Sequence, residues 1–451
     1  MPRPRNEKAC NTCRKRKLKC TEEHPLCTNC FKSSLYCDWS NRPTPIAQHQ
    51  LLPEPDNPRE AIQDHRIAQL FHCYTDEICL WYDLSDQART FGTTVPRMAL
   101  DEPLLFSAII TLAAMHKALT ETKSFRKIAT FYHVRCIRLL ILLKEDDELV
   151  TQGVALAATC LLRNYEIFTG GVGSNVHLSG AYAMASHHGA FLGGLRQGLL
   201  AAGFWNYLRE EITFSLSEGY PLKIRLEHIP EITHHETDQD YLNSITLILG
   251  KLINMTFDGH ITDSQWATAL HMLTRWQNYK PQRLNPFCRE QGGPYKSREF
   301  PALWYLFPCH AAASQYFLVS FIILLVFAPW ELFKEFLAQS SWPTNKEDIL
   351  MGLTLEICGM AFTARRPQVL VNSFGPISYC AKFIWKPSAQ EELKSQLIAC
   401  KPTVGWPVQQ LIKKLDTTWK FGADYNETVR RNRQKERTEQ EKASAASPQQ
   451  N

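Results

Sequence analysis

The sequence predicts two units of unequal size, a small cysteine-rich module at the N-terminus and a large all-α domain. Six of the fifteen cysteines lie between residues 10 and 37, and five prolines follow between residues 43 and 58. From about residue 60, apolar side chains recur at steps of three and four, as on one face of a helix. With 451 residues, 44% of them hydrophobic, the chain can bury a large core. We expect a module at 1–40, a proline-rich linker at 41–60, a helical domain at 61–422 and a polar, disordered tail at 423–451.

The excess positive charge is confined to the N-terminal module. Residues 1–50 hold ten Lys and Arg against four Asp and Glu, whereas the other 401 residues hold 40 against 41. Such a concentration of positive charge favours a polyanionic partner. No apolar run follows the charged N-terminus, as a secretory signal would require. The longest apolar run, Tyr316 to Ala328, has 13 residues, fewer than the roughly 20 that a membrane span needs. We expect an intracellular protein with no membrane segment.

The cysteine cluster follows one half-motif, C-x2-C-x6-C, which is repeated at an offset of 17 residues. In a reducing compartment, clustered cysteines favour metal binding over disulfides. Tetrahedral zinc takes four ligands, so two zinc ions need eight bonds, and six thiolates suffice only if two of them bridge both ions. The repeat suggests that the bridging pair occupies equivalent positions. The spacing predicts two zinc ions per chain, held by Cys10, Cys13, Cys20, Cys27, Cys30 and Cys37; redox thiols or a different metal are the alternatives.

This spacing resembles the motif of the fungal zinc binuclear cluster family of transcription factors. The resemblance implies two short helices around two zinc ions, with Cys10 and Cys27 as the bridging thiolates. It further implies that one zinc site is completed by Cys13 and Cys20 and the other by Cys30 and Cys37. Pro25 matches the loop proline of the family. In the family, the first half-motif is the one that enters the major groove of double-stranded DNA.

The two half-motifs differ in charge. The first holds five basic residues, whereas the second holds only Lys32; the five are Arg14, Lys15, Arg16, Lys17 and Lys19. By the resemblance, Lys17 matches the position that reads a CGG triplet, and a lysine can donate to guanine O6 and N7. We expect the other four to contact phosphates. A basic run by itself is more typical of a nuclear import signal or a solvated face. The alternative from another class is therefore a zinc-dependent redox or scaffold protein whose basic segment binds RNA or serves import.

The remaining sequence predicts helices. Apolar residues from Ile67 to Trp81 form one face of a single helix. Further helical patterns lie at about 103–119, 124–143, 150–168, 203–217, 240–257, 263–277, 300–327 and 346–363. Four stretches, at 94–116, 165–168, 204–216 and 300–317, resemble the helical regulatory region of the same fungal family, with looser motifs than the cysteines.

We find no catalytic motif in this domain. The pairs His187–His188 and His234–His235 are adjacent, so neither places two ligands on one helix face. The glycine-rich segment at 170–174 lacks the lysine of a phosphate loop and predicts a helix-breaking loop. The nine cysteines outside the cluster are interpreted as buried thiols.

Together these features predict a nuclear, sequence-specific DNA-binding regulator of RNA polymerase II transcription that is not an enzyme. We expect it to control a pathway-specific gene set, either a secondary-metabolite cluster or nutrient and catabolic genes. Its expected partners are DNA and the transcription machinery or co-regulators. No heptad pattern follows the cluster, so we expect a homodimer to form through the helical domain; a monomer with additional basic DNA contacts is the alternative.

Overall fold

The computed structural model describes residues 9–23, 27–33, 35, 37–38, 57–187, 198–226, 229–257, 261–293, 298–333 and 345–421. It divides into two compact units, Met1–Glu54 and Pro55–Asn451. Several predicted features lie outside the described residues: Pro25, most of the linker, the side chains of the first histidine pair, and the polar tail.

The smaller unit contains two short helices, α1 (Asn11–Lys15) and α2 (Thr28–Lys32). Each begins directly after a cysteine in an extended conformation. The sulfur of Cys10 accepts the backbone N–H of Cys13, and the sulfur of Cys27 accepts that of Cys30. Helices of five residues are not stable alone in water, so both depend on the cysteine cluster. The two predicted helices around the cysteines are confirmed.

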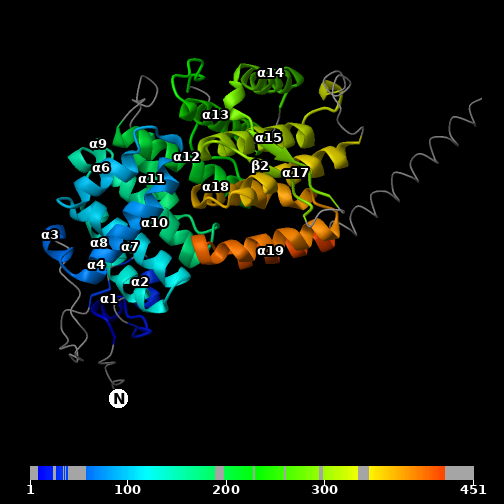
Figure 1. Cartoon of the computed structure of the whole chain (residues 1–451). Coiled ribbons are helices and arrows are strands. Elements are labelled where there is room, and N and C mark those ends of the chain that lie inside the picture. Colours follow the sequence, from blue (N-terminus) through cyan, green and yellow to red (C-terminus); the bar gives the residue numbers. More distant parts are fainter. Residues whose placement is uncertain are drawn as a thin grey trace, which may run out of the picture. The chain divides into compact units, whose positions relative to one another are not determined.

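The first part of the larger unit is built around α7. Its elements are α3 (Pro58–Ala61), α4 (His65–Cys73), α5 (Cys79–Tyr82), α6 (Thr90–Ala99), α7 (Pro103–Thr120), α8 (Arg126–Leu142), α9 (Glu148–Thr151), α10 (Val154–Gly170) and α11 (Val176–His187). Helix α7 packs against α4, α6, α8 and α10 (Figure 1). Most of its residues are buried on every side because neighbours surround it.

The second part contains α12 (Leu199–Glu218), α13 (Asp238–Phe257), α14 (Asp263–Tyr279), α15 (Pro308–Phe327), α17 (Lys346–Thr363), α18 (Pro367–Cys380) and α19 (Pro387–Val404), and residues 408–421 are also helical. Helix α15 packs against α13, α17 and α18, and α12 contacts α10 of the first part as well as α13 and α18. Helix α12 therefore joins the two parts into one core. The predicted class, a cysteine cluster followed by a large helical body, is confirmed.

Three local predictions need correction. The helix expected from residue 300 begins only at Pro308, because 302–304 form strand β2 (Ala302–Trp304), antiparallel to β1 (Cys288–Glu290). The single helix expected from Ile67 to Trp81 is interrupted by a π-helical turn, η1 (Tyr74–Ile78). Of the nine cysteines interpreted as buried thiols, Cys288 is exposed because it lies on strand β1 at the surface. The helix-breaking loop is confirmed, because α10 ends at Gly170.

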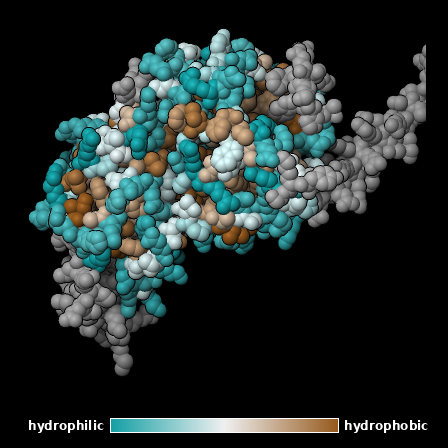
Figure 2. Space-filling view, viewed as in Figure 1, coloured by the Kyte–Doolittle hydropathy of each residue, from teal (hydrophilic) through white to brown (hydrophobic). Residues whose placement is uncertain are grey.

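By length and composition alone, α7 and α15 could each cross a membrane. Within the helical body, 78% and 83% of their apolar windows are buried. Burial of this extent is typical of core helices. The face of the molecule drawn in Figure 2 is mostly hydrophilic, with smaller apolar patches between the polar residues.

A buried ion-pair network fixes the loop after α10. Arg163 is 1% exposed, and its Nη1 lies 3.0 Å from a carboxylate oxygen of Glu166. Its Nη2 donates to the carbonyl oxygen of Val172 at 2.8 Å. Its Nε lies 3.8 Å from the carboxylate of Glu210 in α12. This guanidinium therefore holds the glycine-rich loop and α12 against α10.

Candidate zinc cluster and DNA-facing surface

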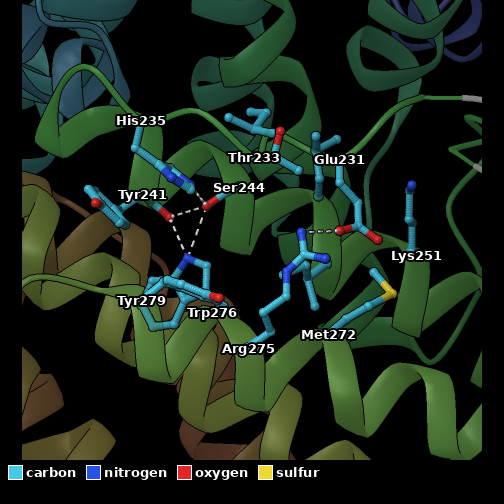
Figure 3. A pocket seen from close by; sticks show the side chains of 13 residues that line it. Glu231, Thr233, His235, Tyr241, Ser244, Lys251, Met272, Arg275, Trp276 and Tyr279 are labelled. Atoms are coloured by element: carbon cyan, nitrogen blue, oxygen red, sulfur yellow. Dashed lines mark hydrogen bonds and ion pairs between the residues drawn. The ribbon is translucent and has the colours of Figure 1, made fainter.

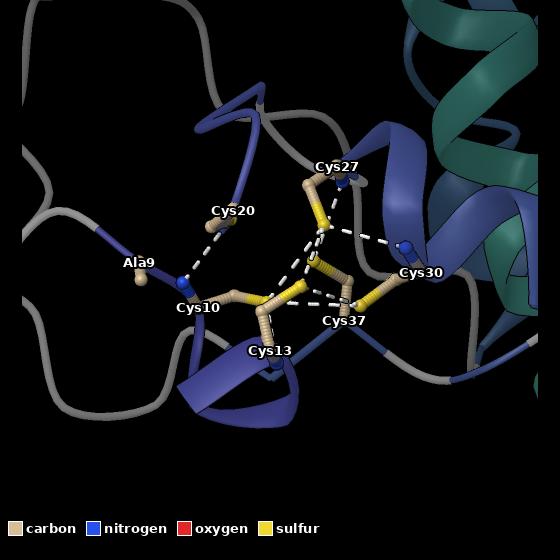
Figure 4. Close-up of a cluster of buried hydrophobic side chains, with 7 residues drawn as sticks. All are labelled: Ala9, Cys10, Cys13, Cys20, Cys27, Cys30 and Cys37. Atoms are coloured by element: carbon tan, nitrogen blue, oxygen red, sulfur yellow. Dashed lines mark hydrogen bonds between the residues drawn. The ribbon is translucent and has the colours of Figure 1, made fainter. Parts of the chain in front are cut away.

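The six predicted ligands are buried free thiols in one small volume. The sulfur of Cys10 lies 3.8 Å from that of Cys27 and 3.7 Å from that of Cys30. The sulfur of Cys13 lies 3.5 Å from that of Cys27 (Figure 4). A tetrahedral zinc with Zn–S bonds of about 2.3 Å places two of its sulfurs about 3.8 Å apart. The spacing of the sulfurs fits zinc.

The sulfurs form two overlapping groups of four. One contains Cys10, Cys13, Cys20 and Cys27, and the other contains Cys10, Cys27, Cys30 and Cys37; within each group all sulfurs lie within 4.8 Å of one another. Cys10 and Cys27 belong to both groups. Six thiols can thus offer four ligands to each of two zinc ions.

The sequence repeat is also a structural repeat. The backbone N–H of Cys10 donates to the sulfur of Cys20 at 3.4 Å, and that of Cys27 donates to the sulfur of Cys37 at 3.3 Å. The two contacts are related by the same offset of 17 residues as the sequence motif. Cys10 and Cys27 therefore occupy equivalent environments in the two halves.

Negative charge is favoured on the two shared sulfurs. Burial raises the pKa of the Cys27 thiol, but the N–H of Cys30 and hydrogen bonds from neighbouring thiols outweigh it and lower the pKa to about 6. For Cys10, burial is likewise outweighed, chiefly by the N–H of Cys13, and the pKa is lowered. Burial raises the pKa of Cys13 and of Cys37 to about 12.

Lys17 occupies a strained position at the end of α1. Its backbone has a φ of 55°, the left-handed region. Its N–H donates to the carbonyl of Arg14 at 3.2 Å, and the N–H of Leu18 donates to that of Cys13 at 3.0 Å. These two bonds are those of a Schellman motif, in which glycine normally occupies the left-handed position. A lysine there carries backbone strain and projects a cation beyond the helix end.

The basic side chains predicted to contact DNA are all exposed: Arg14, Lys15, Arg16, Lys17 and Lys19. Arg14 differs from the other four, because its Nη2 donates to the carbonyl oxygen of Ala9 at 3.3 Å. In the second half-motif the residue equivalent to Arg14 is Phe31, which is 64% exposed. The cationic surface of this unit thus lies on its first half.

The helical body contains a cavity that the sequence did not indicate. It has a volume of about 460 Å³ and lies between the segment 231–235, α13 and α14 (Figure 3). The Trp276 Nε1–H donates to the hydroxyl of Ser244 at 3.0 Å. His235, interpreted as an ordinary histidine, stacks on Tyr241 with ring centroids 4.1 Å apart. Periodicity shows which face of a helix is apolar but not where two such faces fail to meet, so it could not locate this cavity.

Comparison with known proteins identifies two domains. The model of the fungal Zn(2)-Cys(6) binuclear cluster domain matches residues 8–45, and that of the fungal specific transcription factor domain matches residues 69–218. An uncharacterized transcriptional regulatory protein of Schizosaccharomyces pombe is 30% identical over 141 residues, which are 26% of each chain. The Zn(2)-C6 fungal-type transcription factor afumD of Aspergillus fumigatus is 28% identical over 117 residues, 24% of this chain and 31% of the relative.

The aligned part spans about a quarter to a third of the length of these curated relatives. No solved structure matches the chain significantly. The cluster model covers all six cysteines, and the second model covers most of the first part of the helical body. The chain therefore contains a fungal Zn(2)-Cys(6) binuclear cluster domain followed by a fungal specific transcription factor domain.

Proposed function

We propose that the chain is a nuclear, non-catalytic transcription regulator that binds CGG-containing DNA through the first half of its zinc cluster. The observation that carries this proposal is the asymmetry of the cluster unit: two structurally equivalent halves surround one group of thiols, and the exposed cations belong mainly to one half. Zinc supplies structural cross-links here, because the short helices lack an apolar core of their own.

Within this surface, we assign base reading to Lys17 and phosphate contacts to Lys15, Arg16 and Lys19. The left-handed turn at Lys17 supports the assignment, since backbone strain is tolerated where a side chain is needed for function. Arg14, which bonds to Ala9, supports the fold of the unit and adds positive charge. A good base contact contributes about 1 to 3 kcal/mol of discrimination.

The assignment is tested by comparing Lys17→Ala with Lys32→Ala, a matched loss of one exposed charge from the second half. Binding of the full chain to a CGG-containing duplex is measured in competition with a scrambled duplex at fixed salt. We expect Lys17→Ala to lose the preference and Lys32→Ala to keep it. An equal loss in both variants would show that the reading element is misassigned.

We propose Cys10 and Cys27 as the bridging thiolates. Cys13 and Cys20 then complete one zinc site, and Cys30 and Cys37 complete the other. The two overlapping groups of sulfurs support this assignment. In the folded, zinc-loaded protein we expect all six thiols to be protected from alkylation, and to become reactive together when a chelator removes the metal. Rapid alkylation of any of the six while two zinc ions stay bound to them would contradict the shared cluster.

One cluster reads only about three base pairs, which is too little discrimination within a genome. We propose that two chains bind paired triplets as a homodimer formed through the helical body, because no heptads follow the cluster in the sequence. Light scattering of the full chain on a two-triplet duplex should give two chains per duplex. One chain per duplex at micromolar protein would contradict the dimer.

The regulated genes are proposed to form a pathway-specific set, either a secondary-metabolite cluster or nutrient and catabolic genes, with transcription machinery or co-regulators as partners. A genome-wide binding map of the tagged protein distinguishes the two sets. Sites dispersed over unrelated genes would contradict pathway specificity.

A further inference from the structure

We propose that the helical body holds a metal site of its own, formed by Cys73, Glu77 and His116, which takes a divalent cation of the zinc type. The three lie on α4, on η1 and on α7, and their ligand atoms lie within 4.8 Å of one another. Cys73 is 6% exposed and His116 is 2% exposed. This site is separate from the N-terminal cluster and does not depend on DNA binding.

The hydrogen bonding of His116 leaves one ring nitrogen for a ligand. Its Nε2 lies 3.1 Å from the carbonyl oxygen of Thr403. A carbonyl can only accept, so Nε2 carries the proton and the lone pair of the neutral ring is on Nδ1. Nδ1 is buried, and among the described residues no hydrogen-bond partner reaches it. Histidines that ligate metals usually donate their other N–H to a carbonyl or carboxylate in this way. The ring is thus held in the tautomer that a metal requires.

The backbone around the other two ligands is unusual. Cys73 ends α4, and Glu77 lies four residues later within the π-helical turn η1. A spacing of four brings both side chains to the same side of the helix. Both α4 and η1 contact α7, which carries His116. Single π-helical turns are rare and occur frequently at functional sites. The turn therefore points to a role for this segment beyond packing.

The donor set suits zinc. A thiolate, an imidazole nitrogen and a carboxylate are all zinc ligands, and three protein ligands leave a fourth position for water or another group. The Glu77 side chain is 53% exposed, which gives the ion a path from solvent. The opposing charge is Lys117, whose Nζ lies 3.8 Å from Glu77 but 2.7 Å from Glu121. Lys117 can keep its shorter ion pair when a cation takes Glu77.

An ion bound here would cross-link two segments of the first part of the helical body, the continuous stretch of α4 and η1 and the helix α7. Two of its ligands come from α4 and η1, and the third comes from α7. The same histidine bonds to Thr403 near the end of α19, which also packs against α7. Zinc binding at this site is expected to raise the unfolding temperature of the helical body, because it stabilises only the folded arrangement.

The test is the zinc content of the full-length chain after zinc loading and gel filtration, measured by mass spectrometry of the metal. We expect three zinc ions per chain in the wild type and two in each of Cys73→Ala, Glu77→Gln and His116→Gln. Cys400→Ala removes a buried thiol from α19 and serves as the matched control, which should keep three. The double variant Cys10→Ser/Cys27→Ser should lose the cluster zinc and keep one ion.

Circular dichroism of each variant shows whether it is folded. If Cys73→Ala and His116→Gln unfold the protein, the zinc content of Glu77→Gln decides the test, because the Glu77 side chain is half exposed and its replacement should leave the fold intact. Two zinc ions in the loaded wild type would overturn the proposal. So would three ions in Glu77→Gln, or no remaining ion in the folded cluster variant. A failure of DNA selectivity with three zinc ions bound would count against the proposed function and leave this site intact.

Discussion

Replacement of Lys17 by glycine should strengthen the cluster unit and weaken its DNA selectivity at the same time. A non-glycine residue in the left-handed region costs about 1 to 2 kcal/mol, and Lys17 has a φ of 55°. Glycine removes this strain, but its greater conformational entropy stabilises the unfolded chain by about 0.4 to 1 kcal/mol. From the middle of each range, the net stabilisation is about 0.8 kcal/mol, or about a fourfold change in an equilibrium constant.

Folding and zinc binding are one equilibrium in a unit of this size, so the change should appear as tighter zinc retention. The assay is competition with a chelator for the cluster zinc of the full chain. Lys17→Ala is the matched control, because alanine keeps the strain and removes the same charge. We expect the glycine variant to retain zinc about fourfold better than the alanine variant.

Both variants should lose the preference for a CGG duplex, by about 5- to 150-fold if one good base contact is removed. Equal zinc retention in the two variants would refute the strained turn at Lys17. A glycine variant that keeps the CGG preference would refute the assignment of base reading to this side chain.

Three further predictions concern the helical body, each measured by denaturant or thermal unfolding of the full chain. Gly359→Ala should destabilise the helical body by several kcal/mol, because a Cβ at this position would collide with the carbonyl oxygen of Pro301. Gly352→Ala lies in the same helix but meets open space, so it should stabilise the body by up to about 1 kcal/mol. Equal effects of the two substitutions would contradict the close approach of Gly359 to Pro301. Arg163→Met removes the cation that pairs with the carboxylates of Glu166 and Glu210, and should lower the free energy of unfolding by about 3 to 5 kcal/mol. A decrease of less than about 1 kcal/mol would contradict the ion-pair network. Burial lowers the pKa of His133 to about 3, so the unfolded chain binds this proton near its ordinary pKa of about 6.5 while the folded chain does not. This contribution to stability is therefore present above pH 6.5 and is lost as the pH falls from about 6.5 to about 3. His133→Phe should flatten that decline, and an unchanged decline would contradict a neutral ring at this position in the folded chain.

The cluster and the helical class could be predicted from the sequence for physical reasons. Zinc geometry restricts the spacing of thiols so strongly that six cysteines in register define the ligand set. Burial of one face imposes a period near 3.6 on a helix, so α7 and α13 lie close to where the pattern placed them. The charge difference between the half-motifs is local and needs no tertiary information.

Other features depend on contacts between distant segments and could not be predicted. The left-handed turn at Lys17 is occupied by a residue that gives no local signal for it. The strand at 302–304 faces α17, where the N–H of Leu303 donates to the Thr363 hydroxyl at 3.1 Å, and the pattern of 300–327 alone reads as helix. Cys73 and His116 are 43 positions apart in the sequence, with no ligand-like spacing. Their proximity results from the packing of α4 against α7.

The most direct test of the central claim is the affinity of the zinc-loaded full chain for a CGG-containing duplex relative to a scrambled duplex of the same length and salt. If the first half of the cluster reads base edges, the CGG duplex should bind at least about fivefold more tightly, the lower bound for one good base contact. Removal of zinc by a chelator should abolish the difference. Equal affinity for the two duplexes with both zinc ions of the N-terminal cluster bound would contradict the account.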